Sequence, residues 1–348
     1  MRKLDIEKRT REQVLMELKQ DSATWELFGK FKPEHQEELL GFCMGEQGLS
    51  VTYDAVFKKI FDPASHPERL EQFISDVLGQ KVKIVEVLQN QGIIIQEDAS
   101  FVIMDVVVEL EDGTLMNVEM QKYGYNFPAE RTDCYLADLI MRQYSDMKKK
   151  QGKDFQFRDM SKVVAIVIME QSPREFHQWE DRYVHHGEMV YDSGIRLRDL
   201  FESTYVCLDV FKKKCHTEVR NRKEAWMRFL GSREMKDIVE VCEKYPEFIP
   251  LYEEVFRFKR NIKELVRVFS EALAVMTKNT ERYMVEELQK EVDRKDEEIE
   301  KQAGALAKKD KEIEEQAGAL ARKDEEIEKK DQEIQELKRL LAKNEIKS

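Results

Sequence analysis

The segment from Phe101 to Gln121 constrains the fold most strongly, because two alternating apolar runs flank the turn residues Glu111-Asp112-Gly113. An Asp-Gly pair between such runs is a strong signal for a β-hairpin. If the loop has three residues, Gly113 takes the left-handed position and Leu110 pairs with Thr114. A two-residue loop would shift the register by one and move alternate side chains to the other face.

The three-residue loop predicts one polar and one apolar face of the hairpin. Asp105 then lies opposite Glu119, and Gln121 joins Glu119 because side chains alternate along a strand. Asn117 and Glu109 are predicted on the same polar face. The other face is predicted to be apolar, with Val102, Met104, Val106, Val108 and Leu110 opposed by Met116, Val118 and Met120.

The paired acids of this hairpin allow two interpretations. Two carboxylates side by side repel each other unless a cation lies between them, and oxygen ligands on a rigid sheet suit Mg²⁺ or Mn²⁺. Such a cation, held by carboxylates and phosphate oxygens, is the usual centre for phosphoryl transfer. In the other interpretation the hairpin is half-exposed with its polar side in water, since any one-sided antiparallel sheet alternates in this way.

The spacing D-x13-E-x-Q of Asp105, Glu119 and Gln121 resembles the core of the PD-(D/E)XK nuclease superfamily. Two further segments narrow the resemblance to the PD-(D/E)XK family transposases, also called recombination-promoting nucleases. The run Tyr53–Phe61 looks like their opening helix. Their second strand and following helix are similar to Val118–Lys122 followed by Arg131, Cys134 and Tyr135. Gln121 stands where the wider superfamily has Lys, and Gln is usual in the transposase branch.

The resemblance covers about residues 50 to 285 and implies roles for individual residues. Asp105 and Glu119 would be the metal ligands, and Gln121 would orient the water or the phosphate without the charge of a Lys. Asp54 would be a helper acid; otherwise it caps its helix or lies in water.

Two residues of the following helix have roles that stay open. Arg131 and Tyr135 are four residues apart on a predicted helix and share a face, where they would contact phosphate or brace the sheet. Bracing is the prediction for Tyr135, and both roles remain open for Arg131.

The resemblance implies a Mg²⁺- or Mn²⁺-dependent DNA endonuclease that hydrolyses phosphodiester bonds and promotes DNA recombination. The first alternative is a catalytically inactive protein with the nuclease fold, which binds DNA or protein and oligomerises through its C-terminal coiled coil. The second alternative is an interaction scaffold organised by that coiled coil, with a purely structural hairpin.

The net charge of −12 argues against a strong non-specific DNA binder, because most DNA-binding domains are basic. Contacts with DNA must therefore come from local groups of cations. The candidates are Arg131, Lys58, the run Lys148, Lys149 and Lys150, and the run Lys212, Lys213 and Lys214. Each lysine run also fits a solvated surface.

The cysteines and the hydropathy pattern predict a cytoplasmic protein. The five cysteines form no C-x-x-C pair, which fits reduced thiols better than a disulfide framework or a zinc site. Cys134 and Cys207 lie in apolar surroundings and are predicted in the core. The longest apolar run, Val163–Met169, is too short to span a membrane, and no signal peptide is expected.

The predicted fold is α/β, with a restriction-endonuclease-like core in which helices flank a mixed central sheet. Strands are expected at 82–87, in the hairpin, at 162–169 and at 205–211, with helices at 53–78 and 129–150. Four regions follow: a helical extension at 1–48, the nuclease-like core at 50–215, a helical region packed on the core at 216–288, and a tail at 289–348.

The tail contains a 14-residue repeat, in which residues 295–308 recur as 309–322. Apolar residues fall every seven positions, which is heptad spacing: Ile299, Leu306, Ile313, Leu320, Ile327, Ile334 and Leu341. The second seam position is poor, with Ala303 and Ala317 but also Asp310, Asp324 and Asp331. A coiled coil that oligomerises the protein and a solvated, partly disordered single helix both fit this pattern.

Overall fold

The computed structural model describes residues 4–88, 106–123, 128–214 and 218–345. The chain forms two compact units, Met1–Tyr283 and Met284–Ser348, and the regional boundaries predicted above remain predictions. The helices before the sheet are α1 (Arg11–Lys19), α2 (Ser22–Gly29), α3 (Pro33–Met44), α4 (Asp54–Ile60) and α5 (Pro67–Leu78). Those within and after it are α6 (Pro128–Gln151), α7 (Leu208–Lys214), α8 (Arg222–Gly231), α9 (Met235–Lys244), α10 (Ile249–Arg257) and α11 (Ile262–Glu345).

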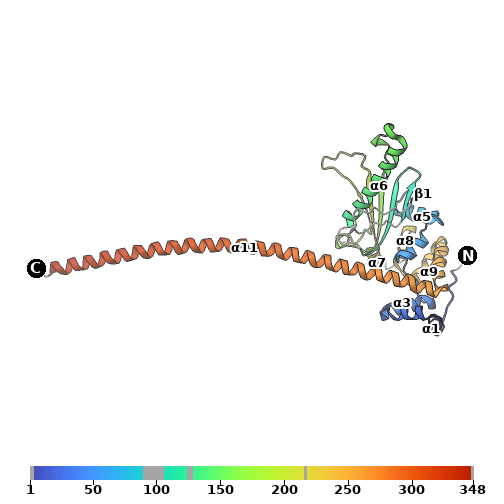
Figure 1. The fold of residues 1–348 in the computed structure, drawn as a ribbon, viewed down its shortest axis with the longest axis horizontal. Helices are drawn as coiled ribbons and strands as arrows, with labels where there is room; N and C mark the ends of the chain where they lie inside the picture. Colours follow the sequence, from blue (N-terminus) through green and yellow to red (C-terminus); the bar gives the residue numbers. More distant parts are fainter. Residues whose placement is uncertain (1–3, 89–105, 124–127, 215–217, 346–348) are drawn as a thin grey trace. The chain divides into compact units, whose positions relative to one another are not determined.

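A mixed six-stranded sheet with flanking helices forms the centre of the first unit (Figure 1), as the α/β prediction requires. Its strands are β1 (Ile84–Leu88), β2 (Val106–Leu110), β3 (Leu115–Tyr123), β4 (Val163–Gln171), β5 (Val184–Glu188) and β6 (Phe201–Cys207). Their order is β1-β2-β3-β4-β6-β5. The pairs β3–β4 and β4–β6 are parallel, and the other three pairs are antiparallel.

The hairpin of β2 and β3 has the predicted three-residue loop. Gly113 has a φ of 80°, and its backbone N–H donates to the Leu110 carbonyl at 2.9 Å. The Leu110 N–H donates to the Thr114 carbonyl at 2.9 Å, and Val106 pairs with Val118 farther along. The predicted register is therefore confirmed as far as Val106, whereas Val102, Met104 and Asp105 lie outside the described residues.

The predicted apolar face of the hairpin packs into the main core. Side chains of Val106, Val108, Met116 and Val118 share one buried cluster with residues of α4, α5, α8 and α10. The aromatic rings of this cluster surround Trp226 of α8, whose ring centroid lies 4.6 Å from that of Phe248, 5.6 Å from that of Phe73 and 5.7 Å from that of Phe61.

The predicted polar face is covered by α6, so the half-exposed interpretation of the hairpin is wrong. On this face Val107 and Leu115 pack with Tyr135, Leu136 and Leu139 of α6 in a second buried cluster. The polar residues beside them are buried as well: Asn117, Glu119 and Gln121 are 0%, 4% and 6% exposed. A helix on each side of the sheet therefore excludes water from both faces of β3.

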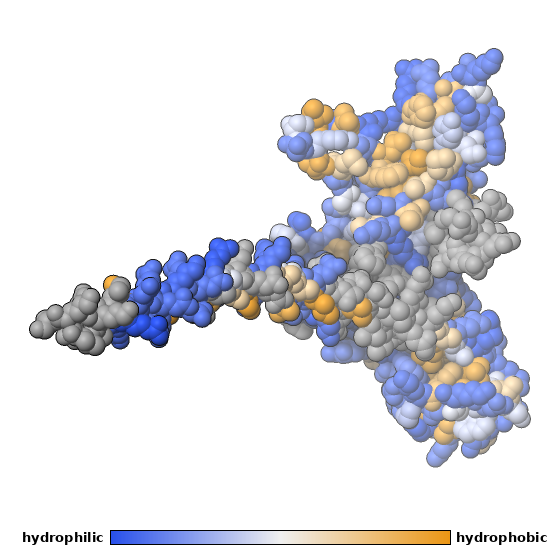
Figure 2. Space-filling model, turned by 60° about the vertical axis from the view of Figure 1, so that its left-hand side comes forward, coloured by the Kyte–Doolittle hydropathy of each residue, from blue (hydrophilic) through white to orange (hydrophobic). Residues whose placement is uncertain are grey.

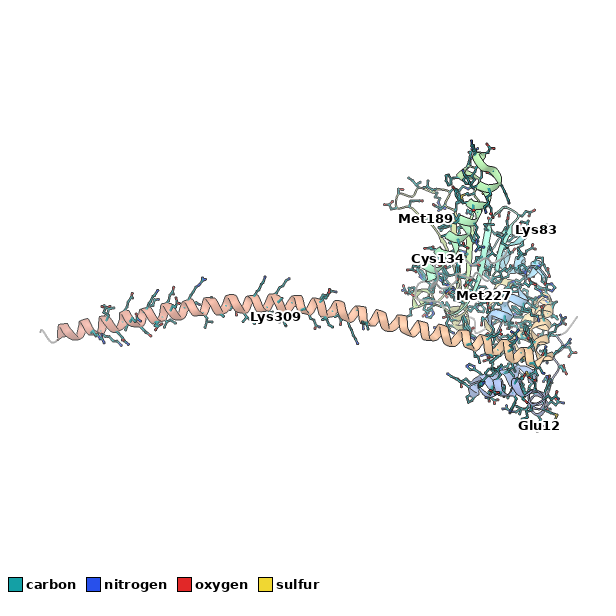
Figure 3. The ribbon with its side chains drawn as sticks, in the orientation of Figure 1. Glu12, Lys83, Cys134, Met189, Met227 and Lys309 are labelled. Atoms are coloured by element: carbon teal, nitrogen blue, oxygen red, sulfur yellow. The ribbon has the colours of Figure 1, made fainter. Side chains whose placement is uncertain are left out.

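The strands after α6 differ partly from the prediction. The buried strand expected at 162–169 is β4, but the strand expected at 205–211 is β6, which ends at Cys207 where α7 begins. The first residues of α7 are apolar like those of β6, so the apolar run continues past the end of the strand. The run is too short to show whether its spacing is that of a strand or of a helix. Cys134, expected in the core, is exposed on α6 (Figure 3).

The first three helices join the main core rather than standing apart from it. The rings of Phe42 in α3 and Phe256 in α10 stack with centroids 5.6 Å apart. The backbone of Gly48 donates to the Arg233 carbonyl at 2.7 Å, which ties the segment before α4 to the segment before α9. Within the described ranges, we find no helix with an apolar stretch long enough to cross a membrane.

Replacing Gly113 by Ala should destabilise the first unit by about 1–2 kcal/mol, because a residue with a Cβ resists a positive φ. An added Cβ would also lie 2.8 Å from the Ser161 hydroxyl oxygen. Urea unfolding measures the change. The matched control is Gly29→Ala in α2, where nothing lies within 4 Å of the new Cβ and the change should be neutral or slightly stabilising. Equal effects of the two substitutions would contradict the hairpin geometry.

Candidate active site

Glu119 lies on β3 beneath the first turns of α6, where two side chains of that helix contact its carboxylate. The Tyr135 hydroxyl donates a hydrogen bond to Glu119 Oε1 at 3.0 Å. A guanidinium nitrogen of Arg131 lies 3.5 Å from the same oxygen. Arg131 Nε also donates to the Tyr135 hydroxyl oxygen at 2.7 Å, so the three groups form a closed triangle.

In this triangle both Arg131 and Tyr135 contact a residue of β3, while a phosphate contact of Arg131 stays a prediction. Because α6 places residues four apart on one face, both side chains reach the same carboxylate. Burial, and then the negative charge of Glu119, raise the pKa of the Tyr135 phenol, so it remains a hydrogen-bond donor at neutral pH. The guanidinium supplies a positive charge beside a buried acid, whose desolvation would otherwise be costly.

Gln121 and Asn117 extend the polar row on either side of Glu119. Among the described residues, no group hydrogen-bonds to the buried side-chain oxygen of Gln121 or to either side-chain polar atom of Asn117. Buried polar atoms normally have a partner, because leaving one unpaired costs about 1–3 kcal/mol. An oxygen of this kind, two residues from a carboxylate on the same face, suits a water molecule or a cation.

Lys122 follows this row directly but cannot serve it, because alternation sends its side chain to the opposite face of the sheet. There its ammonium nitrogen lies 4.5 Å from the centre of the Tyr53 ring and 3.5 Å from a carboxylate oxygen of Glu170 on β4. The positive charge nearest Glu119 that the structure describes therefore comes from Arg131 of α6, not from the strand.

The structure places the remaining predicted residues apart from this triangle. Asp105 lies outside the described residues. Asp54, the first residue of α4, forms an ion pair with Lys58 at 2.8 Å, and the Asp54 side chain is exposed. The buried residues of α4 belong to the core on the opposite face of the sheet from Glu119.

Lys148, Lys149 and Lys150 occupy the last turn of α6, about 25 Å along the helix axis from Arg131. Lys149 and Lys150 line a cavity of about 570 Å³, together with Glu86 of β1 and Glu109 of β2. The predicted DNA-binding residues therefore form no single described patch, but the two ends of α6 both carry cations.

A cluster that the sequence did not reveal lies at the carboxyl ends of β4 and β6. Asp209 accepts hydrogen bonds from the backbone and the hydroxyl of Ser172 at 3.0 and 2.8 Å. His177 Nε2 lies 2.9 Å from Asp209 and 3.1 Å from the Ser172 hydroxyl. A catalytic triad requires acid and serine on opposite ring nitrogens, so we assign this cluster to holding the ends of the two strands together.

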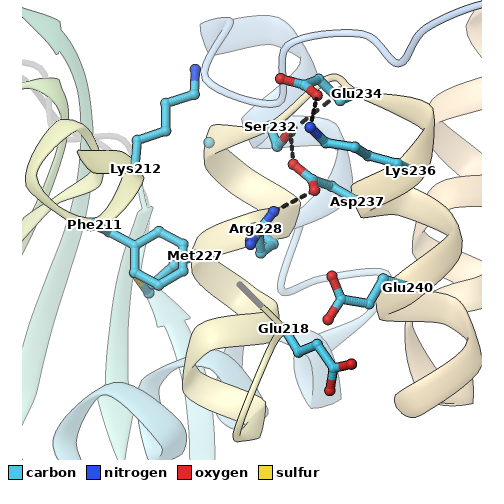
Figure 4. Close-up of a pocket in the computed structure, with 11 residues that line it drawn as sticks. Phe211, Lys212, Glu218, Met227, Arg228, Ser232, Glu234, Lys236, Asp237 and Glu240 are labelled. Carbon is cyan, nitrogen blue, oxygen red and sulfur yellow. Dashed lines mark hydrogen bonds and ion pairs between the residues drawn. The ribbon is translucent and has the colours of Figure 1, made fainter. Parts of the chain in front are cut away.

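A cavity of about 460 Å³ between α7, α8 and α9 is another candidate for a functional site (Figure 4). It lies on the other side of the sheet from Glu119. Its wall contains a buried ion pair between Arg228 and Asp237, and Asp237 also accepts a hydrogen bond from the Ser232 hydroxyl at 2.6 Å. Because the two charges are paired with each other, we assign this ion pair a structural role, which is to join α8 to α9.

The fold and the triangle define an α/β protein whose sheet presents a buried acid and an amide to the N-terminal end of a covering helix. A family model described as "PD-(D/E)XK nuclease family transposase" matches residues 51–297, which include the whole sheet and α6. The chain belongs to this family, as the sequence resemblance predicted. No curated protein and no solved structure matches the chain.

Substitutions of Tyr135 and Glu119 should have strongly non-additive effects on the free energy of unfolding. In a double-mutant cycle of Tyr135→Phe and Glu119→Gln, we expect a coupling free energy of about 1–2 kcal/mol, because the bond is buried and joins a phenol to a carboxylate. The matched control is the hydrogen bond from Tyr191 to Asp199 at 3.0 Å, where we expect a much smaller coupling. Additive effects of the first pair in urea unfolding would contradict the triangle.

Proposed function

We propose that the protein is a divalent-metal-dependent endonuclease that hydrolyses phosphodiester bonds in DNA and thereby promotes recombination. The observation that carries the proposal is the buried pair of Glu119 and Gln121 on one face of β3, within the segment that matches the nuclease family. Burial of an acid and an unpartnered amide oxygen is costly for stability alone, and active sites are where such costs are usually found.

The donor set fits Mg²⁺ or Mn²⁺. Glu119 offers a carboxylate and Gln121 an amide oxygen without a described partner, and hard cations prefer such oxygen ligands. Asp105, outside the described residues, is proposed as the second carboxylate. Among the described residues, no group of three or more His, Cys, Asp and Glu side chains could hold a metal, so the proposal needs Asp105. When bound, a divalent cation would polarise the scissile phosphate and lower the pKa of the attacking water.

The residues of α6 would prepare the site rather than react. Tyr135 donates a hydrogen bond to one oxygen of Glu119, and this bond fixes the direction in which the other oxygen points. Arg131 provides the positive charge that the wider superfamily places on a Lys at the position of Gln121. A guanidinium can also bind a phosphate with two parallel hydrogen bonds, so Arg131 is our candidate for the first contact with the DNA backbone.

Further DNA contacts are proposed for Lys58 and for Lys148, Lys149 and Lys150. Lys148, Lys149 and Lys150 are exposed and Lys58 is half-buried. Phosphate contacts set the position of a protein on DNA without reading its sequence. Because the chain as a whole is acidic, the proposed binding depends on these local cations and should weaken steeply with salt.

One observation favours a second function, a nuclease-fold protein that binds DNA or protein without cutting. Glu119 is already engaged by Tyr135 and Arg131, and position 121 carries an amide in place of a charged amine. A carboxylate paired in this way is a weaker metal ligand than an open one. Oligomerisation through the tail belongs to this alternative and is equally compatible with an enzyme.

Cleavage of supercoiled plasmid decides between the two functions. The intact protein should nick the plasmid with Mg²⁺ or Mn²⁺ and not with EDTA. Asp105→Ala and Glu119→Ala should each lower the rate by more than the roughly 10–100-fold that loss of a positioning group costs. Tyr135→Phe should lower the rate by a factor within that range. Glu109 is an acid of β2 on the same face of the sheet, outside the proposed ligand set, so Glu109→Gln should keep the activity of the intact protein.

Two results would overturn the assignment. Equal cleavage by the parent and by Glu119→Ala would show that another site or a contaminant cuts the DNA. No cleavage with either cation, by protein whose unfolding curve is normal, would leave the binding function as the proposal that stands.

A further inference from the structure

The second unit of the chain carries an apolar stripe that lies in water. Its members recur every seven residues along α11 and are between 47% and 65% exposed: Ile299, Leu306, Ile313, Leu320, Ile327 and Ile334. Figure 2 shows hydrophobic residues standing among hydrophilic ones on this helix. Seven residues are close to two helical turns, so the stripe follows one side of the helix and suits a partner helix.

The charges beside the stripe are arranged in two rows. If the stripe occupies the d position of each heptad, the following e position is acidic and the g position is basic. The basic row contains Lys295, Lys309 and Lys323, and the acidic row contains Glu300, Glu314 and Glu328. Gln302 and Ala307, like Gln316 and Ala321, hold the corresponding positions in the heptads between them.

These rows complement each other when two copies lie parallel and in register. In that arrangement the g residue of one helix meets the e residue of the next heptad in the partner. Lys295 of one copy would then meet Glu300 of the other, and Lys323 would meet Glu328. The pair Lys309 and Glu314 has the same spacing in the sequence. We propose that the tails of two copies of this chain associate as a parallel, in-register coiled coil.

The antiparallel arrangement is opposed by the same charges. There each g position meets a g position and each e position meets an e position, so Lys faces Lys and Glu faces Glu. Like charges placed together are unfavourable and select against that pairing. The orientation therefore follows from the alternation of Lys and Glu rather than from the apolar stripe, which would serve either arrangement.

The seam also limits the strength of the association. The a positions hold Ala303 and Ala317 and also a set of acids that would approach one another in a parallel pair: Asp296, Asp310, Asp324 and Asp331. Each of these acids directly follows a Lys at g, so a lysine of the partner would lie beside it and reduce the repulsion. The association should accordingly be moderate in strength and depend on salt.

A parallel pair has a consequence for the first unit, because that unit precedes Met284 in each chain. Both copies of the first unit would join the coiled coil at the same end, whereas an antiparallel pair would separate them by the length of the tail. Parallel pairing of the tails does not depend on catalysis and is compatible with an enzyme and with a binding protein alike.

Sedimentation of the full chain with charge-reversal variants tests the proposal. Lys295→Glu, Lys309→Glu and Lys323→Glu together should raise the dimer dissociation constant by at least about tenfold. Adding Glu300→Lys, Glu314→Lys and Glu328→Lys to the same chain should restore association, because every proposed pair is then reversed. The matched control is Lys301→Glu, Lys308→Glu and Lys329→Glu, which changes the net charge equally at the outermost f positions and should leave association unchanged.

Three outcomes would overturn the proposal. A parent chain that remains monomeric at all concentrations would show that the stripe has no partner copy. Unchanged association after the first three reversals would move the interface out of the tail. Failure of the six-residue variant to regain association, with helix content unchanged by circular dichroism, would exclude the parallel arrangement.

Discussion

The parallel pairing of β3 with β4 is the constraint on which the first unit depends. It pairs Glu119 with Val167 and Gln121 with Met169, so a neighbouring strand lies along the strand's polar row. A strand in this position needs cover on both faces, because a parallel ladder requires a crossover connection that packs against the sheet. The connection here is α6, and its first turns lie over the acid. The same element that closes the core therefore brings Arg131 and Tyr135 to Glu119.

Burial of this row has an electrostatic cost that the fold only partly offsets. Glu119 receives a phenol, a guanidinium and the positive end of α6, all of which stabilise a carboxylate. Asn117 and the side-chain oxygen of Gln121 receive no such compensation from the described residues. A row that was purely structural would be expected to carry apolar residues, as the neighbouring Val107 and Leu115 do. The contrast within one strand face separates the part that stabilises the fold from the part proposed to act on substrate.

The two units of the chain follow different physical rules. The first unit is held by aromatic and aliphatic packing on both faces of the sheet and by buried ion pairs such as Arg228 with Asp237. The second is a helix whose heptad period and charges can be recognised from its sequence. Most of it lies beyond residue 297, where the match to the nuclease family ends. Changes in the tail would therefore alter the proposed association between copies and leave the proposed site unchanged.

The amino-acid sequence by itself determined the features that depend on neighbouring residues. The Asp-Gly turn, the left-handed Gly113 and the alternation of Met116, Val118 and Met120 specified the hairpin and its register, since loop length and pleat are local. The sequence also predicted the buried strand β4, the helix α6 and the heptad spacing of the tail. The short apolar run around Cys207 was not, because a strand that passes into a helix within a few residues shows neither period clearly.

Only the tertiary structure decided what covers the hairpin's polar face. Alternation alone could not distinguish water from a helix there, because both leave the same pattern on the strand. The spacing of Arg131 and Tyr135 showed that they share a face, but their contact with Glu119 depends on the angle at which α6 crosses the sheet. That angle is set by Leu136 and Leu139 packing against Val107 and Leu115, residues that are distant in the sequence. Contacts of this kind arise from the packing of whole elements, and no local pattern records them.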